Sequence, residues 1–337
     1  MKLQAPSILI PIKISIIIPL HNKGKYLAET LQSIISQSLS DWEAIVVENN
    51  SCDDGPRIAQ RFATEDQRIR FLNASSSSVF GPGAARNFGL NHSSGEWVLF
   101  LDADDQIEKR HLESLLAQAK QIPTANVIVG KWKEYREDNP SKLTLQHPAC
   151  CDKGQVDLLG YSIAFAPWAV HAAIVRRSAI TDDLRWPEEL DRVLGEDIHF
   201  WFRLLHQNEV AFCESAGALY RTHTPNRRNQ LQEITKWHQG IDAAVTANLN
   251  YLKNHGEKPA ALQARSLCRL YSELYSQAKK QKAKDIGDDC IAKAQKWHQL
   301  AHKQTSRPAM KERIENLLGL KTSLALRSMF HKITRPV

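Results

Sequence analysis

Continuous apolar segments alternate with helical patterns along the first 130 residues of the chain. The segment KISIIIPL is rich in isoleucine and has no polar alternation, which is typical of a strand buried on both faces. Four further segments share this apolar character: 42–48, 69–73, 96–101 and 126–130. Helical spacing lies between them, at 26–37, 56–64, 84–91 and 110–119. This order predicts an α/β fold with a mostly parallel, Rossmann-like sheet and helices on both of its faces.

The pattern changes beyond residue 131. The polar stretch 137–160 predicts an irregular excursion, and 166–178 predicts a strand or a pair of strands. A helix is expected at 195–207, followed by two short strands at 209–214 and 217–223. From Asn229 almost to the end the chain predicts helices, with breaks near Gly256–Pro259, Gly287 and Pro308.

The composition is that of a globular protein, with 42% hydrophobic and 24% charged residues. Six scattered cysteines without a C-x-x-C pair favour free thiols in a reducing cytoplasm over a disulfide framework or a zinc site. Pro11 and Lys13 interrupt the apolar amino terminus, so we expect a first strand there rather than a signal peptide. No segment reaches the roughly 18 apolar residues that a membrane span needs.

The net charge of +7 is concentrated near the carboxyl terminus. Residues 241–337 hold 18 basic and 8 acidic residues, a net charge of +10, so the remainder carries −3. A uniformly basic nucleic-acid-binding protein would not show this asymmetry, and no nucleic-acid partner is expected. The segment 314–333 mixes leucines with basic residues and predicts peripheral contact with an anionic membrane surface, or with a partner. Packing of its apolar residues on the rest of the chain is the alternative.

Three carboxylates crowd the end of the fourth apolar segment: Asp102, Asp104 and Asp105. Like charges at this spacing repel one another, and a bound cation would neutralise them. Oxygen ligands favour Mg²⁺ or Mn²⁺, and ligands of open α/β sheets bind at the carboxyl ends of strands. A solvated turn in which Asp104 caps the next helix is the other interpretation.

Polar residues also follow the first two strands, in P-L-H-N (19–22) and E-N-N-S-C-D-D-G (48–55). The ends of neighbouring parallel strands form a crevice that can hold a base and a ribose, although the same residue types are common in turns. The segment G-P-G-A-A-R-N (81–87) opens a helix, and its backbone amides with Arg86 could meet an anionic group. It is neither a Walker loop nor a dinucleotide fingerprint.

The second half of the chain holds the remaining candidates. Glu196 and Asp197 begin a predicted helix, where an acidic residue is also a common cap. Y-R-T-H (220–223) ends a predicted strand. Trp168, Trp186, Trp201 and His171 could present aromatic planes to a sugar or could fill the core.

In this order, PLHN, VVENNS, GAARN, FLDADD, GED and YRTH resemble the family 2 nucleotide-sugar glycosyltransferases with the GT-A fold, over about residues 12–225. The resemblance implies that the segment Asp102-Ala103-Asp104 holds the nucleotide sugar and a divalent cation, Mn²⁺ or Mg²⁺. It implies that Asp197 is the catalytic base. Glu196 is an acceptor-side candidate beside it, and Trp168 and Trp186 are acceptor-side candidates because aromatic planes suit sugar faces. His223 would be a second ligand of the cation at Asp104.

The same resemblance assigns the nucleoside contacts and the domains. Arg86 would lie near the donor, and the nucleoside would contact Pro19, Leu20, His21, Glu48 and Asn49. We expect a GT-A catalytic domain at 12–228, with a nucleotide-binding half at 12–131 and an acceptor half at 160–228. A basic helical region would follow at 229–337. The family usually has Asp-Asp-Gly-Ser after the second strand, where this chain has Glu48-Asn49-Asn50-Ser51. Asn both donates and accepts hydrogen bonds while Asp only accepts, so this departure leaves the base preference open. Uracil is the first expectation, with guanine and thymine as alternatives.

The expected activity is transfer of a sugar, with inversion, from a nucleotide-sugar donor to a hydroxyl of a saccharide or a lipid-linked glycan. The expected location is the cytoplasm, with peripheral contact at the inner membrane face. The alternative is a GT-A-fold protein that binds sugar nucleotides or serves as a scaffold without turnover. A nucleotidyltransferase is less consistent, because the chain lacks a glycine-rich phosphate loop with a lysine.

Overall fold

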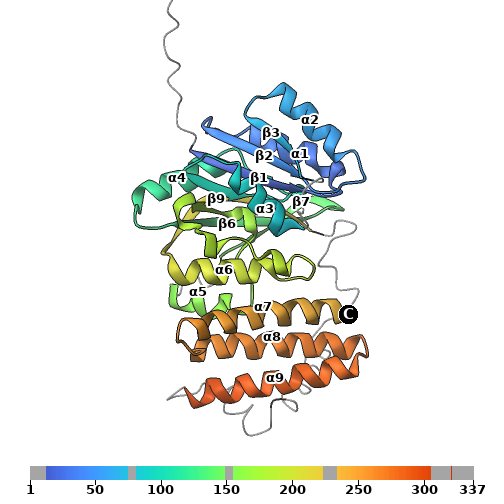
Figure 1. The fold of residues 1–337 in the computed structure, drawn as a ribbon, viewed down its shortest axis with the longest axis vertical. Helices are drawn as coiled ribbons and strands as arrows, with labels where there is room; N and C mark the ends of the chain where they lie inside the picture. The colour runs from blue at the N-terminus through green and yellow to red at the C-terminus, as the bar shows by residue number, and fades with distance from the viewer. Residues whose placement is uncertain (1–12, 75–80, 149–154, 223–233, 305–319, 321–337) are drawn as a thin grey trace, which may run out of the picture. The chain divides into compact units, whose positions relative to one another are not determined.

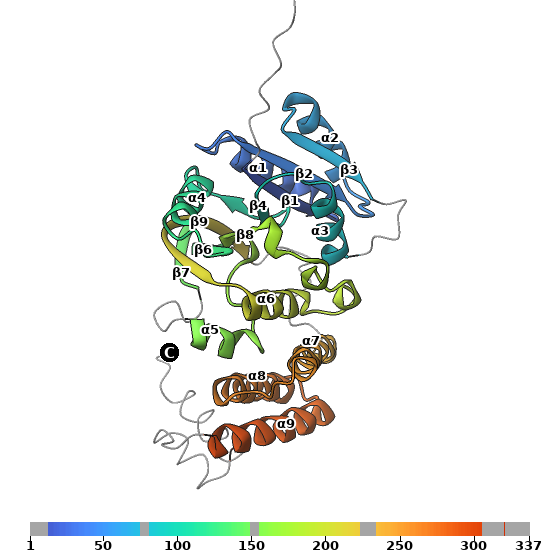
Figure 2. The ribbon, with the colours of Figure 1, turned by 60° about the vertical axis from the view of Figure 1, so that its left-hand side comes forward.

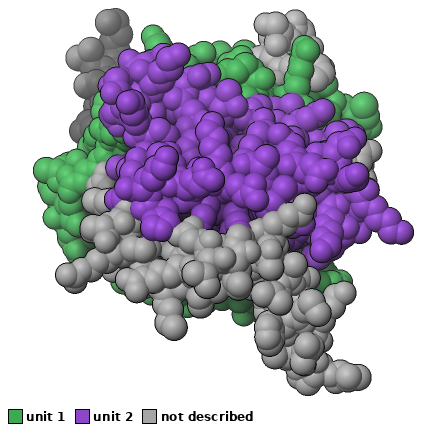
Figure 3. Space-filling view, turned by 90° about the horizontal axis from the view of Figure 1, so that it is seen from below, with its two compact units in different colours: residues 1–151, 168–192, 203–227 green, residues 152–167, 193–202, 228–337 purple. Residues whose placement is uncertain are grey.

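The structure is a computed structural model, and it describes residues 13–74, 81–148, 155–222, 234–304 and 320. It divides into two compact units, which Figure 3 colours separately. Unit 1 comprises residues 1–151, 168–192 and 203–227, and unit 2 comprises residues 152–167, 193–202 and 228–337.

One nine-stranded sheet organises unit 1, in the order β3-β2-β1-β4-β8-β6-β9-β5, with β7 paired to β6 (Figures 1 and 2). The first four strands of this order are parallel to one another. They are β1 (Ile14–Leu20), β2 (Trp42–Glu48), β3 (Ile69–Asn73) and β4 (Trp97–Phe100). The predicted α/β architecture is therefore confirmed, and these strands lie close to their predicted positions.

Alternate residues of these strands face two different cores. Ile16 and Ile18 pack with residues of α1 (Gly24–Ile35) and α2 (Gly55–Glu65). Val47 packs on the opposite face with Ala85 of α3 (Pro82–Asn91). Because both faces are covered, every residue of β2 is buried, which explains the continuous apolar runs in the sequence.

The sheet is mixed beyond β4. The short strand β8 (Ala173–Arg176) lies antiparallel between β4 and β6 (Val127–Arg136). The strand β6 runs parallel to β9 (Val210–Thr222), and β5 (Gln106–Ile107) pairs antiparallel with β9. The helix α4 (His111–Gln121) connects β5 to β6. The fifth predicted strand therefore does not extend the parallel row next to β4.

Two local predictions are wrong. The polar stretch 137–160 contains β7 (Asn139–Gln146) and α5 (Gln155–Ser162) instead of only irregular chain. Almost every residue of β7 is exposed, including Leu143 and Leu145, so pairing with β6 rather than burial of an apolar face makes this strand. The two strands expected at 209–214 and 217–223 are the single strand β9, which passes a register shift opposite Gly130 and Trp132.

Unit 2 contains the helices predicted after Asn229: α7 (Ile234–Asn254), α8 (Ala261–Lys280) and α9 (Lys284–Lys303). The break at Gly256 is confirmed, with a φ of 72°. The break expected near Gly287 lies a few residues earlier, at 281–283, where Lys282 has a φ of 58°, and Gly287 itself is inside α9. Pro308 and almost all of the segment 314–333 lie outside the described residues.

Candidate active site

The carboxyl ends of β1 and β2 bring two predicted segments together. Leu20 pairs with Glu48 in the parallel register. The Asn49 amide donates to the Leu20 carbonyl at 2.9 Å, and His21 Nδ1 lies 2.7 Å from the Asn49 carbonyl oxygen. Since a carbonyl only accepts hydrogen bonds, this contact assigns a proton to Nδ1 of His21. The residues expected to contact a nucleoside therefore lie at one edge of the sheet.

Glu48 and Asn49 have different roles at this edge. The buried carboxylate of Glu48 accepts hydrogen bonds from the amide and the hydroxyl of Ser51, at 2.5 and 2.9 Å. It stabilises the turn in which Asn50 adopts a φ of 60°. The Asn49 side chain donates to the Gly81 carbonyl at 2.9 Å and so connects the end of β2 to the start of α3.

The three aspartates after β4 have three different environments. Asp102 accepts a hydrogen bond from Arg86 Nη2 at 2.6 Å, and Asp104 accepts one from Lys23 Nζ at 2.6 Å. Asp105 is buried and accepts one from the amide of Arg221 at 2.8 Å. Protein cations therefore neutralise Asp102 and Asp104 in this structure, where the sequence analysis expected a bound cation.

Arg86 is placed by aromatic packing as well as by charge. Its guanidinium lies 4.2 Å from the centre of the Trp186 ring, and Phe100 meets the same ring edge-on at 5.2 Å between centroids. The Arg86 side chain is 6% exposed, whereas that of Asp102 is 34% exposed. The more exposed partner of this ion pair is therefore Asp102.

The amides at the start of α3 already have an anionic partner. The sequence predicts that an anionic ligand could bind the amides of the G-P-G-A-A-R-N segment. In the structure, the carboxylate of Asp191 accepts hydrogen bonds from Gly83 and Ala84. This corrects the interpretation of the glycine-rich segment, although its Arg86 does contact Asp102.

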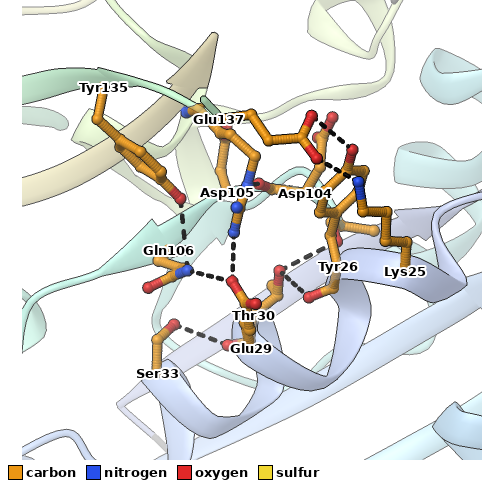
Figure 4. A network of polar contacts seen from close by, with 12 residues as sticks. Lys25, Tyr26, Glu29, Thr30, Ser33, Asp104, Asp105, Gln106, Tyr135 and Glu137 are labelled. Atoms are coloured by element: carbon orange, nitrogen blue, oxygen red, sulfur yellow. Dashed lines mark hydrogen bonds and ion pairs between the residues drawn. The ribbon is translucent and has the colours of Figure 1, made fainter. Parts of the chain in front are cut away.

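Arg221, which the sequence analysis did not single out, ties the Y-R-T-H segment to the aspartate loop. Its Nε donates to the Asp104 carbonyl at 2.9 Å, and Nη2 donates to Glu29 of α1 at 2.5 Å. Figure 4 shows the surrounding network, in which Gln106 also donates to Glu29. Tyr135, from β6, stacks under the Arg221 guanidinium at 5.1 Å. Its partners lie 117 and 192 positions away in the sequence, so no local pattern indicated this role.

Two buried histidines, His111 and His171, lie near the aspartate loop. His111 donates to the His171 carbonyl at 2.9 Å and accepts from the Gly217 amide at 3.0 Å, which assigns its proton to Nε2. Burial lowers the pKa of His111 to about 3 and that of His171 to about 4. His171 Nδ1 lies 3.4 Å from Asp105, but a neutral ring forms no ion pair there at neutral pH.

The remaining candidates separate into three groups. Trp168 and Trp186 are buried, at 4% and 2% exposure, so both rings serve packing rather than stacking on an acceptor sugar. Glu196 and Asp197 lie in the first turn of α6 (Glu196–Gln207), within the part of this helix that belongs to unit 2. Asp197 accepts a hydrogen bond from the Ile198 amide at 2.9 Å. His223 lies outside the described residues.

The aspartate loop fits a divalent cation at two of its three carboxylates. Asp102 and Asp104 offer the oxygen ligands that Mg²⁺ and Mn²⁺ prefer, and their side chains are 34% and 13% exposed. Asp105 does not fit, because its carboxylate is buried against the Arg221 amide. A cation at Asp104 would replace the ammonium group of Lys23.

Residues 15–183 match the family model described as Glycosyl transferase family 2. The match spans half of the chain, and the chain belongs to this family. The matched segment contains β1, α3, Arg86 and the aspartate loop, and it ends before Glu196 and Asp197.

Two curated relatives illustrate the sequence similarity. Glycosyltransferase GlyG of Streptococcus pneumoniae serotype 4 is 31% identical over 126 residues, which are 37% of this chain and 41% of that protein. The GalNAc(5)-diNAcBac-PP-undecaprenol beta-1,3-glucosyltransferase of Campylobacter jejuni is 37% identical over 110 residues, 32% of this chain and 35% of that protein. The chain thus matches less than half of the length of either relative.

Two solved structures share the fold. S. aureus TarS 1–349, solved in complex with UDP-GlcNAc, superposes with a TM-score of 0.57 at 17% identity, covering 88% of this chain and 93% of that one. The mannosyltransferase PcManGT from Pyrobaculum calidifontis, in complex with GDP-Man and Mn²⁺, gives 0.52 at 17% identity over 96% and 83% of the two chains. These likenesses confirm the GT-A-type fold with a helical carboxyl-terminal region. In the described part of the chain, no helix has the length and apolarity to cross a bilayer.

Proposed function

We propose that this chain is an inverting glycosyltransferase that moves a sugar from a UDP-sugar to a hydroxyl group of a saccharide or a lipid-linked glycan. The observation that carries the proposal is the meeting of Lys23 and Arg86 with Asp104 and Asp102 just beyond β4. This position is the carboxyl edge of the parallel strands, where ligands of open α/β sheets bind. Two protein cations beside two accessible carboxylates suit a diphosphate that carries its own divalent cation.

The nucleoside would bind where β1 and β2 end. His21 and Asn49 present ring and amide groups that can both donate and accept hydrogen bonds. The TarS and PcManGT complexes contain UDP-GlcNAc and GDP-Man, respectively. They support a nucleotide-sugar donor for this chain, and uracil and guanine are therefore the two bases to compare first.

The chemistry is direct displacement of a nucleoside diphosphate from the anomeric carbon. A divalent cation bound by Asp102 and Asp104 would supply counter-charge to the leaving diphosphate. Arg86 would add a fixed positive charge on the same side. Asp197 would accept the proton of the acceptor hydroxyl, a contribution of roughly 10²–10⁴-fold. A single base acting on one face of the sugar gives inversion.

A ligand screen tests this proposal directly. Thermal unfolding is followed with UDP, GDP and dTDP, each with and without Mn²⁺, and a bound nucleotide raises the melting temperature by mass action. We expect stabilisation by UDP that requires Mn²⁺, and slow hydrolysis of a UDP-sugar under the same conditions. Binding without hydrolysis or transfer would favour the scaffold alternative. Absence of stabilisation by any of the three nucleotides would refute the proposal.

A cytoplasmic location with contact to an anionic membrane surface is part of the same proposal. It is supported by the charge of +10 on residues 241–337, since each basic group near such a surface contributes about 1 kcal/mol. Flotation of the full chain with anionic and neutral liposomes at low and high salt measures this contact. Equal behaviour with both liposome types would contradict it.

A further inference from the structure

The amino-terminal end of α3 is capped by a carboxylate from a distant part of the chain. Asp191 follows the short helix η4 (Glu188–Leu190) and is 8% exposed. Its Oδ1 accepts a hydrogen bond from the Gly83 amide at 2.8 Å, and its Oδ2 accepts one from the Ala84 amide at 2.7 Å. Amides in the first turn of a helix have no partner within the helix and carry partial positive charge. A buried carboxylate is therefore a strong partner for them.

The two glycines of this turn make room for that carboxylate. A Cβ atom on Gly83 would lie 2.6 Å from Asp191 Oδ1, and one on Gly81 would lie 2.5 Å from the Asp191 Cβ. Gly81 also has a φ of 91°, which disfavours any other residue. The G-P-G pattern is thus explained by a contact within the protein.

The segment that carries Asp191 forms a second hydrogen-bonded contact with α3, one turn further along the helix. Asn87 accepts a hydrogen bond from the Trp186 amide at 3.0 Å and donates one to the Trp186 carbonyl at 2.9 Å. Arg86 lies between these two attachments, with its guanidinium against the Trp186 ring and its Nη2 on Asp102. The orientation of α3 relative to the segment 186–191 therefore sets where the guanidinium lies.

We propose that Asp191 is a positioning residue, whose carboxylate locks the start of α3 to the segment 186–191 and thereby holds Arg86 at Asp102. The inference rests on the proposed function in one respect, namely that Arg86 acts on the donor diphosphate. Asp191 acts through the helix, because its carboxylate oxygens accept the hydrogen bonds of the Gly83 and Ala84 amides.

The first test is a double-mutant cycle on nucleotide affinity, measured by calorimetry with UDP and with GDP in the presence of Mn²⁺. We expect Asp191→Asn to weaken nucleotide binding by about tenfold. The Asn side chain has only one oxygen, so its NH2 group, a donor, would face one of the two backbone N–H donors. In an Arg86→Met background the same change should have no further effect. Glu189→Gln, which removes an exposed carboxylate from the same segment, is the matched control and should bind normally.

A purely structural role would lower stability but leave the affinity of the folded protein unchanged. Unchanged affinity of Asp191→Asn, or an equal loss in both backgrounds, would therefore overturn the inference. If Asp191→Asn does not fold, Gly83→Ala replaces it in the cycle, since its Cβ would displace the same carboxylate from the helix side.

The second test does not depend on a ligand. Amide hydrogen exchange at Gly83, Ala84 and Arg86 reports local opening of the start of α3. We expect exchange about tenfold faster in Asp191→Asn than in the parent or in Glu189→Gln. If the parent binds no nucleotide, the proposed function fails, and this measurement still decides whether Asp191 holds α3. Unchanged exchange overturns the inference.

Discussion

Arg86 Nη2 lies 2.6 Å from Asp102 Oδ1, and this ion pair joins the only arginine of α3 to the loop that follows β4. The neighbouring carboxylate of Asp104 has its own cation in Lys23, which precedes α1. The two aspartates separated by Ala103 are thus held by two different elements of the fold. A metal and a diphosphate entering this site would therefore displace existing ion pairs.

Lys23 should compete with a divalent cation for Asp104. We expect Lys23→Met to tighten Mn²⁺ binding by up to about fivefold, which is the change in affinity that corresponds to the free energy of a partly exposed ion pair. Electron paramagnetic resonance of free Mn²⁺ measures this without nucleotide. Lys25→Met is the matched control, because Lys25 pairs with Glu137 instead. Equal or weaker Mn²⁺ binding by Lys23→Met would contradict the competition.

Asp104 should be required for metal-dependent nucleotide binding. We expect Asp104→Ala to abolish the Mn²⁺-dependent rise in melting temperature caused by UDP, because the more buried of the two ligands is lost. Asp182→Asn, on the exposed helix η3 (Asp182–Leu184), serves as the control. An Asp104→Ala protein that binds UDP as tightly, with the same metal requirement, would remove Asp104 from the site.

Asp197 should serve the chemical step rather than donor affinity. Asp197→Asn keeps the size of the side chain and removes the base, so transfer should fall by at least about 10²-fold while nucleotide affinity stays constant. Asp285→Asn makes the same change in the first turn of α9 and controls for the helix-end charge. Retained transfer would leave Asp197 with a capping role only.

The buried histidines should make the protein less stable in mild acid. Their folded pKa values, about 3 for His111 and about 4 for His171, lie below the ordinary 6.5. The unfolded chain therefore binds more protons between pH 6.5 and about 4, and the stabilisation that is complete above pH 6.5 is lost progressively as the pH falls. Each histidine contributes a slope of about 1.4 kcal/mol per pH unit in this window.

Urea unfolding at pH 7, 6 and 5 measures this slope. His171→Gln removes one of the two titrating rings, so its free energy of unfolding should fall less steeply with decreasing pH than that of the parent. His92→Gln, at an exposed site after α3, is the control. Parallel curves for His171→Gln and the parent would show that His171 takes up its proton equally well in the folded state.

Arg221 should stabilise unit 1 beyond its charge. It donates to the Asp104 carbonyl and to Glu29 and lies against the ring of Tyr26 at 4.8 Å. Lysine cannot make these divergent hydrogen bonds, so Arg221→Lys should lower the free energy of unfolding by about 1–3 kcal/mol. Arg136→Lys, at an exposed ion pair with Asp138, should change it by less than about 1 kcal/mol. Equal effects would contradict the role of Arg221.

Much of the fold of residues 12–131 follows from local patterns. The apolar runs locate β1 to β4 because strands covered on both faces favour apolar side chains. The same strands are parallel and adjacent, so the residues after them necessarily meet at one edge, as His21 and Asn49 do. The order of the strands beyond β4 depended on pairings between distant segments, which leave no local signal; β7 is the clearest case, with its exposed, polar sequence.

The sequence by itself determined the family, the parallel part of the sheet, and the identity of the acidic residues after β4. Only the tertiary structure decided what each charged group contacts. Lys23 and Asp104 are 81 positions apart, and Asp191 and Gly83 are 108 positions apart. Such partners are set by how α1, α3 and the segment 186–191 pack on the sheet. The role of a charged side chain depends on the groups it contacts. Sequence periodicity identifies strands and helices, but only their packing brings residues that are distant in the sequence into contact.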